Sequence, residues 1–481
     1  MIMRLVAFAT VSLIAAAPAL AGEAEVVPHG AIITTDAGQK VRVLAYADGT
    51  FRVTVADVLP DAPPTAMVVA EADGSPQVDV DEASVTLTTQ QSSARIALAD
   101  GQLTVRDAEG KLLLDEYARS RRIDPVTLEG QQWFKTRVQF NRGTDEGLYG
   151  LGQQQNRQMN YNGEDVELAQ HNIATAIPYL LSTRGYGILW DNASITRVGD
   201  PDPYEKLALD WNTQYYLGDR LALERSEPVI DYQFLDDQDR WPEEAKADTV
   251  AATSGQNTQG NAVQTQRVVW TGSYTPESTG KHKFRLYSSS YVTVYADGKE
   301  VLDRWRQNWN PWYHNFELDL TAGKPIDLRV EWEPNQGYIA LYHADPLPSE
   351  DRHSVSFASE AGKAIDYYVV PGDDMDALVA GYRRLTGEAS MMPRWAYGFW
   401  QSRQRYQTQD ELVDVIQMYR DADIPIDAIV QDWFYWPEDQ WGCNCFDPKR
   451  FPDPKGMVDA VHDLNGRLMI SVWPKFYPDT Q

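Results

Sequence analysis

The segment DAIVQDWFYW at 427–436 combines residue types that suit the binding of a sugar. Its apolar part predicts a buried parallel strand, which ends at Asp432 and is followed by Trp433 and Phe434. A pyranose needs hydrogen-bond acceptors for its hydroxyls and aromatic faces for its C–H groups, and barrel enzymes place such groups at strand carboxyl ends. A core strand with surplus aromatic residues would have the same composition, so the flanking elements must distinguish the two interpretations.

The elements around this segment have the spacing of βαβ units. Helical patterns begin at Asp374, at the capping box from Thr408 to Glu411, and at Asp453 with a proline in the first turn. The predicted apolar strands are 396–400, 426–431 and 467–473. Strands that alternate with helices predict a parallel sheet. A barrel is favoured over a doubly wound sheet, because no glycine-rich phosphate loop follows any strand and the distinctive polar and aromatic residues lie at strand carboxyl ends.

The chain before residue 374 has the two-residue alternation of β-structure. From residue 25 to about 220, short alternating runs are separated by Asp-Gly pairs, which is typical of a β-sandwich. A polar, low-complexity segment from Ala247 to Gln264 predicts a flexible loop or linker. Alternation returns after it, with a hairpin predicted around Asp297-Gly298, and indicates a second β unit.

Composition limits the class of partner. The 481 residues suffice for about three domains. The net charge of −27, from 70 acidic and 43 basic residues, disfavours nucleic acid and polyanionic substrates. A neutral polysaccharide would not be repelled, and 15 Trp with 25 Tyr supply stacking surfaces. We therefore expect a carbohydrate partner and no nucleic acid.

The first 21 residues have the pattern of a secretory signal. Arg4 precedes an apolar run over 5–20, and a small-x-small motif ends at Ala21, where cleavage is expected. A membrane anchor is the alternative, but the apolar run is shorter than the roughly 20 residues that a spanning helix needs. We expect a periplasmic or secreted protein without a membrane span.

The two cysteines, Cys443 and Cys445, are separated by one residue. They match neither a disulfide framework nor a tetrahedral metal site, which needs more ligands. A strained local disulfide is the alternative in an oxidising compartment. We expect two free thiols without an assigned function, and we expect no metal or cofactor.

The second β unit, over about 225–355, resembles the protective-antigen (PA-14) domain through TGSYTPESTGKHKFRLYSSSYVTVYADGKEVLDRW at 271–305. This module is associated with glycan contact, so the resemblance implies that several of its aromatic residues stack on sugars. The candidates are Trp305, Trp309, Trp312 and Tyr313. Packing within the module or against its neighbour is the alternative.

Motifs along nearly the whole chain resemble glycoside hydrolase family 31. They are GLYGLG at 147–152, PYLLSTRGYGIL at 178–189, DYYVVPG at 366–372, YRRLTG at 382–387, WAYGFW at 395–400, IVQDWFYW at 429–436, FDPKRFPDP at 446–454 and SVWPKFYP at 471–478. The resemblance implies a multidomain fold: a family-31 β-sandwich with the PA-14-like β-sandwich inserted, then about three strands of a (β/α)8 TIM barrel. The implied boundaries are 1–21 for the signal peptide, 22–224 for the N-terminal β-sandwich, 225–355 for the insert, 356–387 for the end of the N-terminal domain with a run-in helix, and 388–481 for the incomplete barrel.

The same resemblance implies roles for the strand-end residues. Asp432, with Trp433 and Phe434 beside it, would accept hydrogen bonds from the terminal sugar in the −1 subsite without reacting. Trp473 and Lys475 would line the same pocket, the alternatives being a rim aromatic and a solvated lysine.

Retaining hydrolysis is the implied mechanism, with one carboxylate as nucleophile and another as general acid/base. In the family both lie on later barrel strands, so we expect them beyond Gln481 and expect the chain alone to be inactive. Asp410, Asp421 and Asp423 are not assigned as catalysts, because they precede the strand carboxyl ends.

Phe434 favours a pentose. In the family's α-glucosidases the corresponding position is commonly a second acid that serves the C6 side of the sugar. A bulky ring would crowd a hydroxymethyl group and leave its hydroxyl unpaired, which costs roughly 1–3 kcal/mol, or about tenfold to a hundredfold in discrimination. We expect an exo-acting α-xylosidase for xyloglucan oligosaccharides. An α-glucosidase or α-transglycosylase of the same family, and a non-catalytic carbohydrate-binding protein, are the alternatives.

Overall fold

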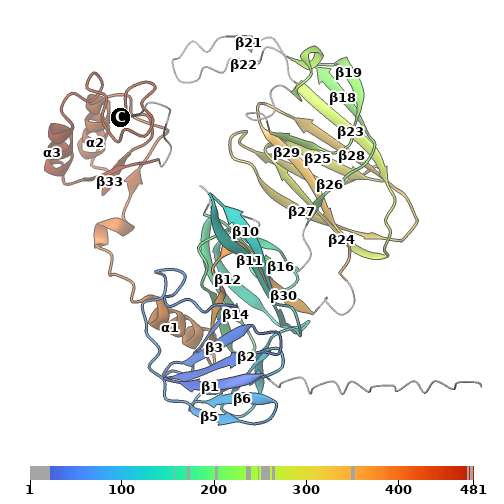
Figure 1. Cartoon of the computed structure of the whole chain (residues 1–481). Helices are drawn as coiled ribbons and strands as arrows, with labels where there is room; N and C mark the ends of the chain where they lie inside the picture. Colours follow the sequence, from blue (N-terminus) through green and yellow to red (C-terminus); the bar gives the residue numbers. More distant parts are fainter. Residues whose placement is uncertain are drawn as a thin grey trace, which may run out of the picture. The chain divides into compact units, whose positions relative to one another are not determined.

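The computed structural model describes residues 22–155, 158–170, 174–200, 204–233, 240–246, 249–250, 261–262, 266–347, 353–473, 476 and 480. The chain divides into two compact units, residues 1–387 and 388–481 (Figure 1). The predicted signal segment, most of the polar segment 247–264 and Lys475 lie outside the described residues. None of the described helices is long and apolar enough to cross a membrane.

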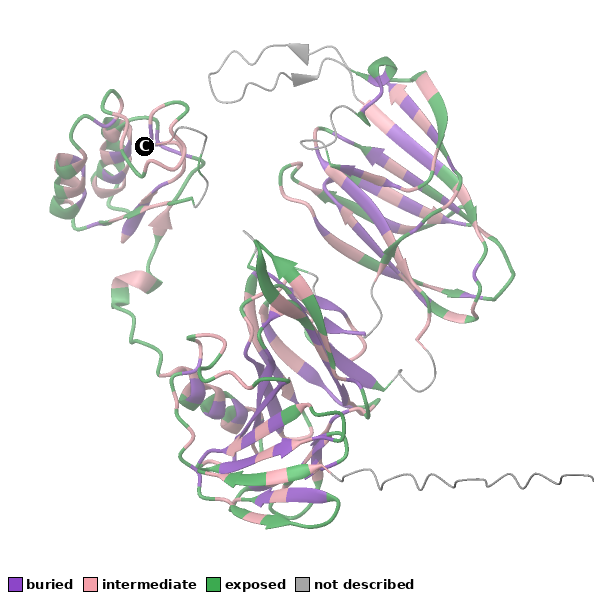
Figure 2. Cartoon of the chain, viewed as in Figure 1, coloured by how far each residue is buried: buried purple, intermediate pink, exposed green. Residues whose placement is uncertain are grey.

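The first unit begins with an antiparallel β-sandwich whose largest sheet has eight strands. In spatial order these are β1 (Glu23–Val27), β2 (Gly30–Thr34), β3 (Lys40–Ala45), β4 (Phe51–Ala56), β31 (Ile365–Pro371), β15 (Tyr186–Trp190), β14 (Thr175–Ser182) and β12 (Leu148–Gln153). The central strand β4 is buried along its whole length, whereas β3 alternates between buried and more accessible residues. The same alternation marks strands of both sandwiches in Figure 2 and confirms the predicted period of two.

Two five-stranded sheets complete this first sandwich. One contains β10 (Arg122–Leu128), β11 (Gln131–Asn141), β30 (Ser354–Gly362), β16 (Thr196–Gly199) and β13 (Val166–Leu168). The other contains β5 (Gln77–Val80), β6 (Ser84–Thr88), β7 (Ser92–Ala97), β8 (Leu103–Asp107) and β9 (Leu112–Asp115). In the core, the ring of Trp190 stacks on Phe357 at 5.4 Å and on Tyr367 at 6.3 Å between ring centroids.

The second β-sandwich is inserted between two neighbouring strands of the first. β16 and β30 pair antiparallel with Gly199 opposite Ser356, and the chain between them forms the insert. One insert sheet contains β17 (Glu205–Lys206), β29 (Tyr338–Ala344), β24 (Gly280–Ser288) and β27 (Trp312–Leu320), with β20 (Asp231–Gln233) beside β29. The other contains β19 (Arg220–Glu227), β18 (Trp211–Leu217), β23 (Gln266–Tyr274), β28 (Ile326–Glu333), β25 (Ser290–Ala296) and β26 (Lys299–Arg306). β21 (Thr249–Val250) pairs with β22 (Asn261–Ala262).

The sheets of the insert include strands that precede the predicted boundary at 224/225. β17 and β18 lie before it, and β19 runs across it. Sequence alternation continues through both sandwiches, so it does not mark the residue at which the chain changes sheets. The hairpin predicted at Asp297-Gly298 joins β25 to β26, and both turn residues have positive φ, as a two-residue turn requires.

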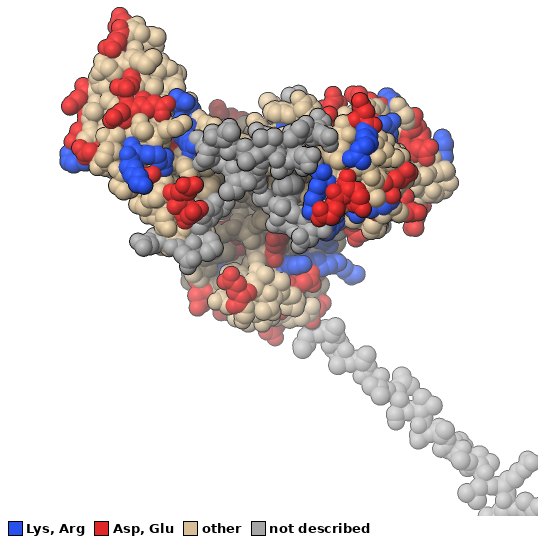
Figure 3. Space-filling model, turned by 90° about the horizontal axis from the view of Figure 1, so that it is seen from above, with Lys and Arg blue, Asp and Glu red and all other residues tan. Residues whose placement is uncertain are grey.

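The first unit ends with α1 (Met375–Thr386), which packs against its sheet. The Asp374 side chain caps the helix by accepting a hydrogen bond from the amide of Ala377, and Gly387 ends it at φ 89°. The Tyr179 hydroxyl of β14 donates to the carbonyl of Leu378 at 2.7 Å. On the face shown in Figure 3, acidic and basic side chains of the described residues are scattered among other residues.

The second unit contains a three-stranded parallel sheet of β32 (Trp400–Gln401), β33 (Ala428–Gln431) and β34 (Arg467–Ile470). The helices α2 (Gln409–Asp421) and α3 (Pro454–Asp463) connect successive strands. Thr408 and Asp453 cap them by accepting from the amides of Glu411 and Gly456, which confirms both predicted starts. This is the βαβ order predicted for the beginning of a TIM barrel.

The strand predicted at 396–400 is wrong over most of its length. Residues Arg394–Tyr397 form a 3-10 helix after Pro393, and only Trp400–Gln401 pair with β33. The amides of Ala396 and Gly398 donate to carbonyls three residues back, so they are not available to a sheet. The segment thus has the apolar composition of a strand, but its backbone hydrogen bonds are those of a 3-10 helix.

Candidate functional site

Asp432 lies at the carboxyl end of β33, as the sequence predicts. The strand before it is buried, and Gln431 anchors the strand end by donating from Nε2 to the carbonyls of Tyr406 and Asp432, both at 3.2 Å. The Asp432 side chain is half-buried, and no described residue donates a hydrogen bond to its carboxylate. Its two oxygens are therefore free to accept hydrogen bonds from a ligand.

Trp473 follows β34 and reaches the same edge of the sheet. The amide of Ser471 donates to the carbonyl of Gln431 at 2.9 Å, which holds the two strand ends side by side. The rings of Trp433 and Trp473 lie 6.2 Å apart, and Trp473 is 38% exposed. The structure thus brings together Asp432, Trp433 and Trp473, whereas Lys475 lies outside the described residues.

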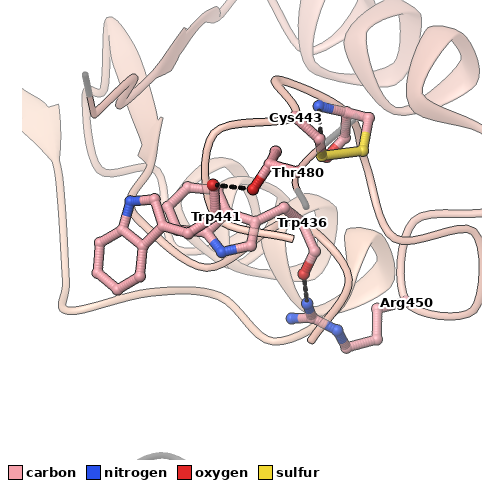
Figure 4. The surroundings of a disulfide bond; sticks show 6 residues. Trp436, Trp441, Cys443, Arg450 and Thr480 are labelled. Carbon is pink, nitrogen blue, oxygen red and sulfur yellow. Dashed lines mark hydrogen bonds between the residues drawn. A yellow bond between two sulfur atoms is a disulfide. The ribbon is translucent and has the colours of Figure 1, made fainter. Parts of the chain in front are cut away.

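Trp441 is a member of this aromatic cluster that the sequence analysis did not identify. Its ring lies 5.5 Å from Trp433 and 5.2 Å from Trp473, so it joins the two predicted residues. The Thr480 hydroxyl donates to its carbonyl at 2.8 Å (Figure 4). The only signal in the sequence was a tryptophan in the loop after an Asp-bearing strand.

Phe434 has an unusual backbone and is held by two cations. Its φ of 63° lies in the left-handed region, which a bulky residue rarely adopts. The guanidinium carbons of Arg405 and Arg450 lie 4.7 Å and 5.1 Å from the centre of its ring. These contacts cover the ring and fix an apolar group two residues after Asp432.

Arg405 is a second residue that the sequence analysis missed. It is buried, it also lies 5.4 Å from the ring centre of Trp433, and its Nε and Nη1 atoms have no hydrogen-bond partner among the described residues. Burial and the nearby Arg450 lower the pKa of the Arg405 guanidinium. A buried donor without a partner is rare in proteins, so its position against Trp433 and Phe434 marks Arg405 as a candidate for a ligand contact. No local pattern marked it.

The FDPKRFPDP motif holds the aromatic loop that follows Asp432. Arg450 donates to Asp447 Oδ2 at 2.8 Å and to the carbonyl of Trp436 at 2.6 Å. Phe451 is buried, and Asp453 caps α3. This segment therefore positions the aromatic loop that follows Asp432.

Cys443 and Cys445 form a disulfide, so the expectation of two free thiols is wrong (Figure 4). The intervening Asn444 and the preceding Gly442 have positive φ values of 51° and 103°. This tight turn brings the two Cα atoms within 5.2 Å, inside the range that a disulfide allows. Spacing alone did not reveal the turn. The bridge lies in the loop that also carries Trp441.

The four aromatic candidates in the insert differ in exposure. Trp305 and Trp309 are 54% and 61% exposed, whereas Trp312 is buried. The Tyr313 hydroxyl donates to Glu167 of the first sandwich at 3.2 Å. Trp305, Trp312 and Tyr313 also line a cavity of about 400 Å³ in this unit. Packing thus accounts for Trp312 and the hydroxyl of Tyr313, while Trp305 and Trp309 present open faces.

Comparison with known proteins gives three family matches. Residues 40–198 match the glycosyl hydrolase 31 N-terminal galactose mutarotase-like domain, 225–350 match the PA14 domain, and 389–481 match the glycosyl hydrolases family 31 TIM-barrel domain. These matches confirm the predicted domain types.

Individual relatives point to the same family. An α-xylosidase of Saccharolobus solfataricus is 47% identical over 149 residues, which are 31% of this chain and 20% of the relative. An uncharacterized family 31 glucosidase of Pseudescherichia vulneris is 36% identical over 29% of this chain and 26% of its own. The crystal structure of the GH31 α-xylosidase from Xanthomonas citri is 43% identical, with a TM-score of 0.84 over 95% of this chain and 50% of that one. The chain thus spans about half the length of that structure.

Proposed function

Because the chain belongs to glycoside hydrolase family 31, with a PA14 domain inserted in its N-terminal β-sandwich, we propose that it serves the release of terminal α-linked xylose from xyloglucan-type oligosaccharides. The proposed reaction is hydrolysis with retention of configuration. The α-xylosidase relatives in Saccharolobus solfataricus and Xanthomonas citri support this choice of sugar.

The observation that carries the proposal is the pairing of Asp432 with Phe434. Asp432 offers two acceptor oxygens for the hydroxyls of a sugar ring. Phe434, whose ring lies close to the guanidinium groups of Arg405 and Arg450, places an apolar group two residues further on. That ring can accept no hydrogen bond from the O6 hydroxyl of a hexose, while a pentose has no such group. The site therefore favours xylose over glucose.

The position of the aspartates on and after α2 supports leaving them unassigned as catalysts. Asp410 and Asp421 lie within α2, and Asp423 follows its end, before β33 begins. All three precede β33, whereas Asp432 follows it, and catalytic groups of TIM barrels lie at strand carboxyl ends. We assign Asp432 to substrate positioning and leave the nucleophile and the general acid/base outside residues 388–473.

Substitution of Phe434 tests the choice of sugar. In the product of the complete reading frame that encodes this chain, Phe434→Asp should shift the ratio of kcat/KM for aryl α-xyloside over aryl α-glucoside about tenfold to a hundredfold towards the glucoside. Phe434→Tyr, which keeps the ring, is the matched control and should retain the preference. An unchanged ratio in Phe434→Asp would contradict the proposed specificity.

We further propose a periplasmic or extracellular location. The Cys443–Cys445 disulfide suits an oxidising compartment, and β1 begins at Glu23, two residues after the predicted cleavage site. Amino-terminal sequencing of the exported protein should give Gly22 as the first residue. Detection of residues 1–21 in the mature protein would overturn this placement.

A further inference from the structure

Two histidines and an aspartate meet at one end of the inserted sandwich. His282 of β24 is fully buried, and its ring stacks on that of His343 of β29 with centroids 5.1 Å apart. His282 Nδ1 lies 2.9 Å from His343 Nε2 and 3.4 Å from Asp345 Oδ1. One ligand atom from each residue lies within 4.8 Å of the other two.

Strand register brings these residues together. β24 and β29 pair antiparallel with Phe284 opposite His343. Residues two apart on a strand share a face, so His282 and Asp345 extend the face on which Phe284 and His343 lie. Phe284 and Tyr274 of β23 close the cluster on its apolar side, with ring centroids 4.9 Å and 5.0 Å from that of His343.

The hydrogen bond to Ser278 fixes the tautomer of His282. Its Nε2 lies 2.9 Å from the carbonyl oxygen of Ser278. A carbonyl only accepts, so this nitrogen carries the proton and Nδ1 presents a lone pair. That lone pair faces His343 Nε2 and the carboxylate of Asp345, which is an acceptor as well.

The Nε2 atom of His343 faces the same space from β29, 2.9 Å from His282 Nδ1. The Tyr274 hydroxyl lies 3.4 Å from His343 Nε2, and the Ser278 hydroxyl donates to Asp345 Oδ1 at 3.2 Å. Two imidazole nitrogens and a carboxylate oxygen thus converge, and a cation bound there would replace the hydrogen bond between the two rings.

We propose that His282 Nδ1, His343 Nε2 and Asp345 Oδ1 bind one zinc ion. Neutral imidazole nitrogens with a carboxylate suit this metal, and Zn–N bonds of about 2.0–2.1 Å in tetrahedral geometry separate ligand atoms by about 3.3 Å. The observed separations of 2.9 Å and 3.4 Å lie on either side of that value.

The surroundings complete such a site. The Asp345 side chain is 61% exposed, so metal can enter from solvent and water can take the fourth position. The Ser278 carbonyl orients His282 from outside the coordination sphere, as partners of metal-bound histidines generally do. The metal would link β24 to the end of β29 and the residue that follows it.

The test uses the untagged chain after treatment with a chelator. Zinc added to this protein should bind at one equivalent per chain, by calorimetry and by metal analysis after gel filtration, and should raise the melting temperature. Asp345→Asn changes an exposed residue and should weaken zinc binding about tenfold or more. His343→Asn should remove the stoichiometric binding.

His353→Asn is the matched control, because His353 is an exposed histidine outside the cluster. It should bind zinc like the unchanged chain. A charged His282–Asp345 pair without metal is the competing explanation, and it predicts no stoichiometric zinc binding. Absence of such binding, or equal affinity in the unchanged chain and in Asp345→Asn, would overturn the proposal.

Discussion

The two units of the chain differ in whether a buried charged side chain has a hydrogen-bonding partner. In the first sandwich, the buried Arg52 donates to Asp366 from Nε at 3.0 Å and Nη2 at 2.8 Å, and Thr54 donates to the same carboxylate. In the second unit, the buried Arg405 has two nitrogen atoms without a hydrogen-bond partner among the described residues. The carboxylate of Asp432 accepts no hydrogen bond from any described residue.

This difference separates groups that stabilise the fold from groups prepared for a ligand. A buried charge without a partner lowers stability, so a fold retains one mainly where another molecule completes the pairing. The aromatic rings around Arg405 strengthen this interpretation, since Trp433 and Phe434 both face the guanidinium. Three substitutions can break or sharpen the comparison.

Removing Asp366 should have the largest effect. Asp366→Ala leaves Arg52 buried without its partner and should lower the free energy of unfolding of the first unit by about 3–5 kcal/mol in urea denaturation. Asp48→Ala is the control, because it breaks the ion pair with Arg384, whose side chain is half exposed, and should cost less than about 1 kcal/mol. Equal losses in the two variants would contradict the assignment.

Asp191 is a buried carboxylate of the first sandwich that is only partly paired. Replacing it should change the free energy of unfolding by an intermediate amount that depends on pH. It is buried with Oδ2 unpaired, and burial raises its pKa to about 6 although Thr65 donates to Oδ1. In the unfolded chain the pKa is about 3.9, so the folded state holds the proton longer and stability falls as pH rises from about 4 to about 6.

Asp191→Asn removes this titration. The free energy of unfolding of this variant minus that of the unchanged chain should therefore rise by about 1–3 kcal/mol from pH 4 to pH 7. Above pH 7 this difference should stay constant. Urea denaturation at a series of pH values measures the difference. Parallel stability curves for the two proteins would show that the charge of Asp191 is accommodated at no cost.

Replacing Arg405 should change stability least. Arg405→Met keeps a long apolar side chain against Trp433 and Phe434 and should alter the free energy of unfolding by less than about 1 kcal/mol, because a lost cation–π contact offsets the relief of an unpaired charge. Affinity for xylose, measured by tryptophan fluorescence, should fall about tenfold.

Arg403→Met tests a neighbouring arginine that is half exposed and pairs with Glu411. It should leave the affinity for xylose unchanged. Should Arg405→Met destabilise the unit strongly while retaining its affinity, Arg405 would be a structural residue like Arg52, and the contrast between the two units would disappear.

Local sequence patterns predicted what local interactions determine. Asp374, Thr408 and Asp453 cap their helices through hydrogen bonds that span three residues, so the sequence contains the whole signal. The Asp297-Gly298 hairpin is equally local. The order of the parallel strands followed from the alternation of these elements.

Features that depend on distant segments were missed. Arg405 carries no local mark, because its burial arises from Trp433 and Phe434, which belong to another strand end. The disulfide of Cys443 and Cys445 depended on a backbone turn that the residue spacing does not specify. The pairing of β18 with β23 across the insert also joins distant segments, which the local alternation of β18 does not specify.

The position of the insert also bears on how such a protein can be altered. Gly199 and Ser356 face each other on neighbouring strands, which lie about 5 Å apart in any sheet. In its connectivity the insert is therefore a long loop between two paired strands, and loop-closure entropy rises only slowly with loop length. A replacement for the insert therefore has to join the ends of β16 and β30, and it would remove contacts such as the hydrogen bond from Tyr313 to Glu167.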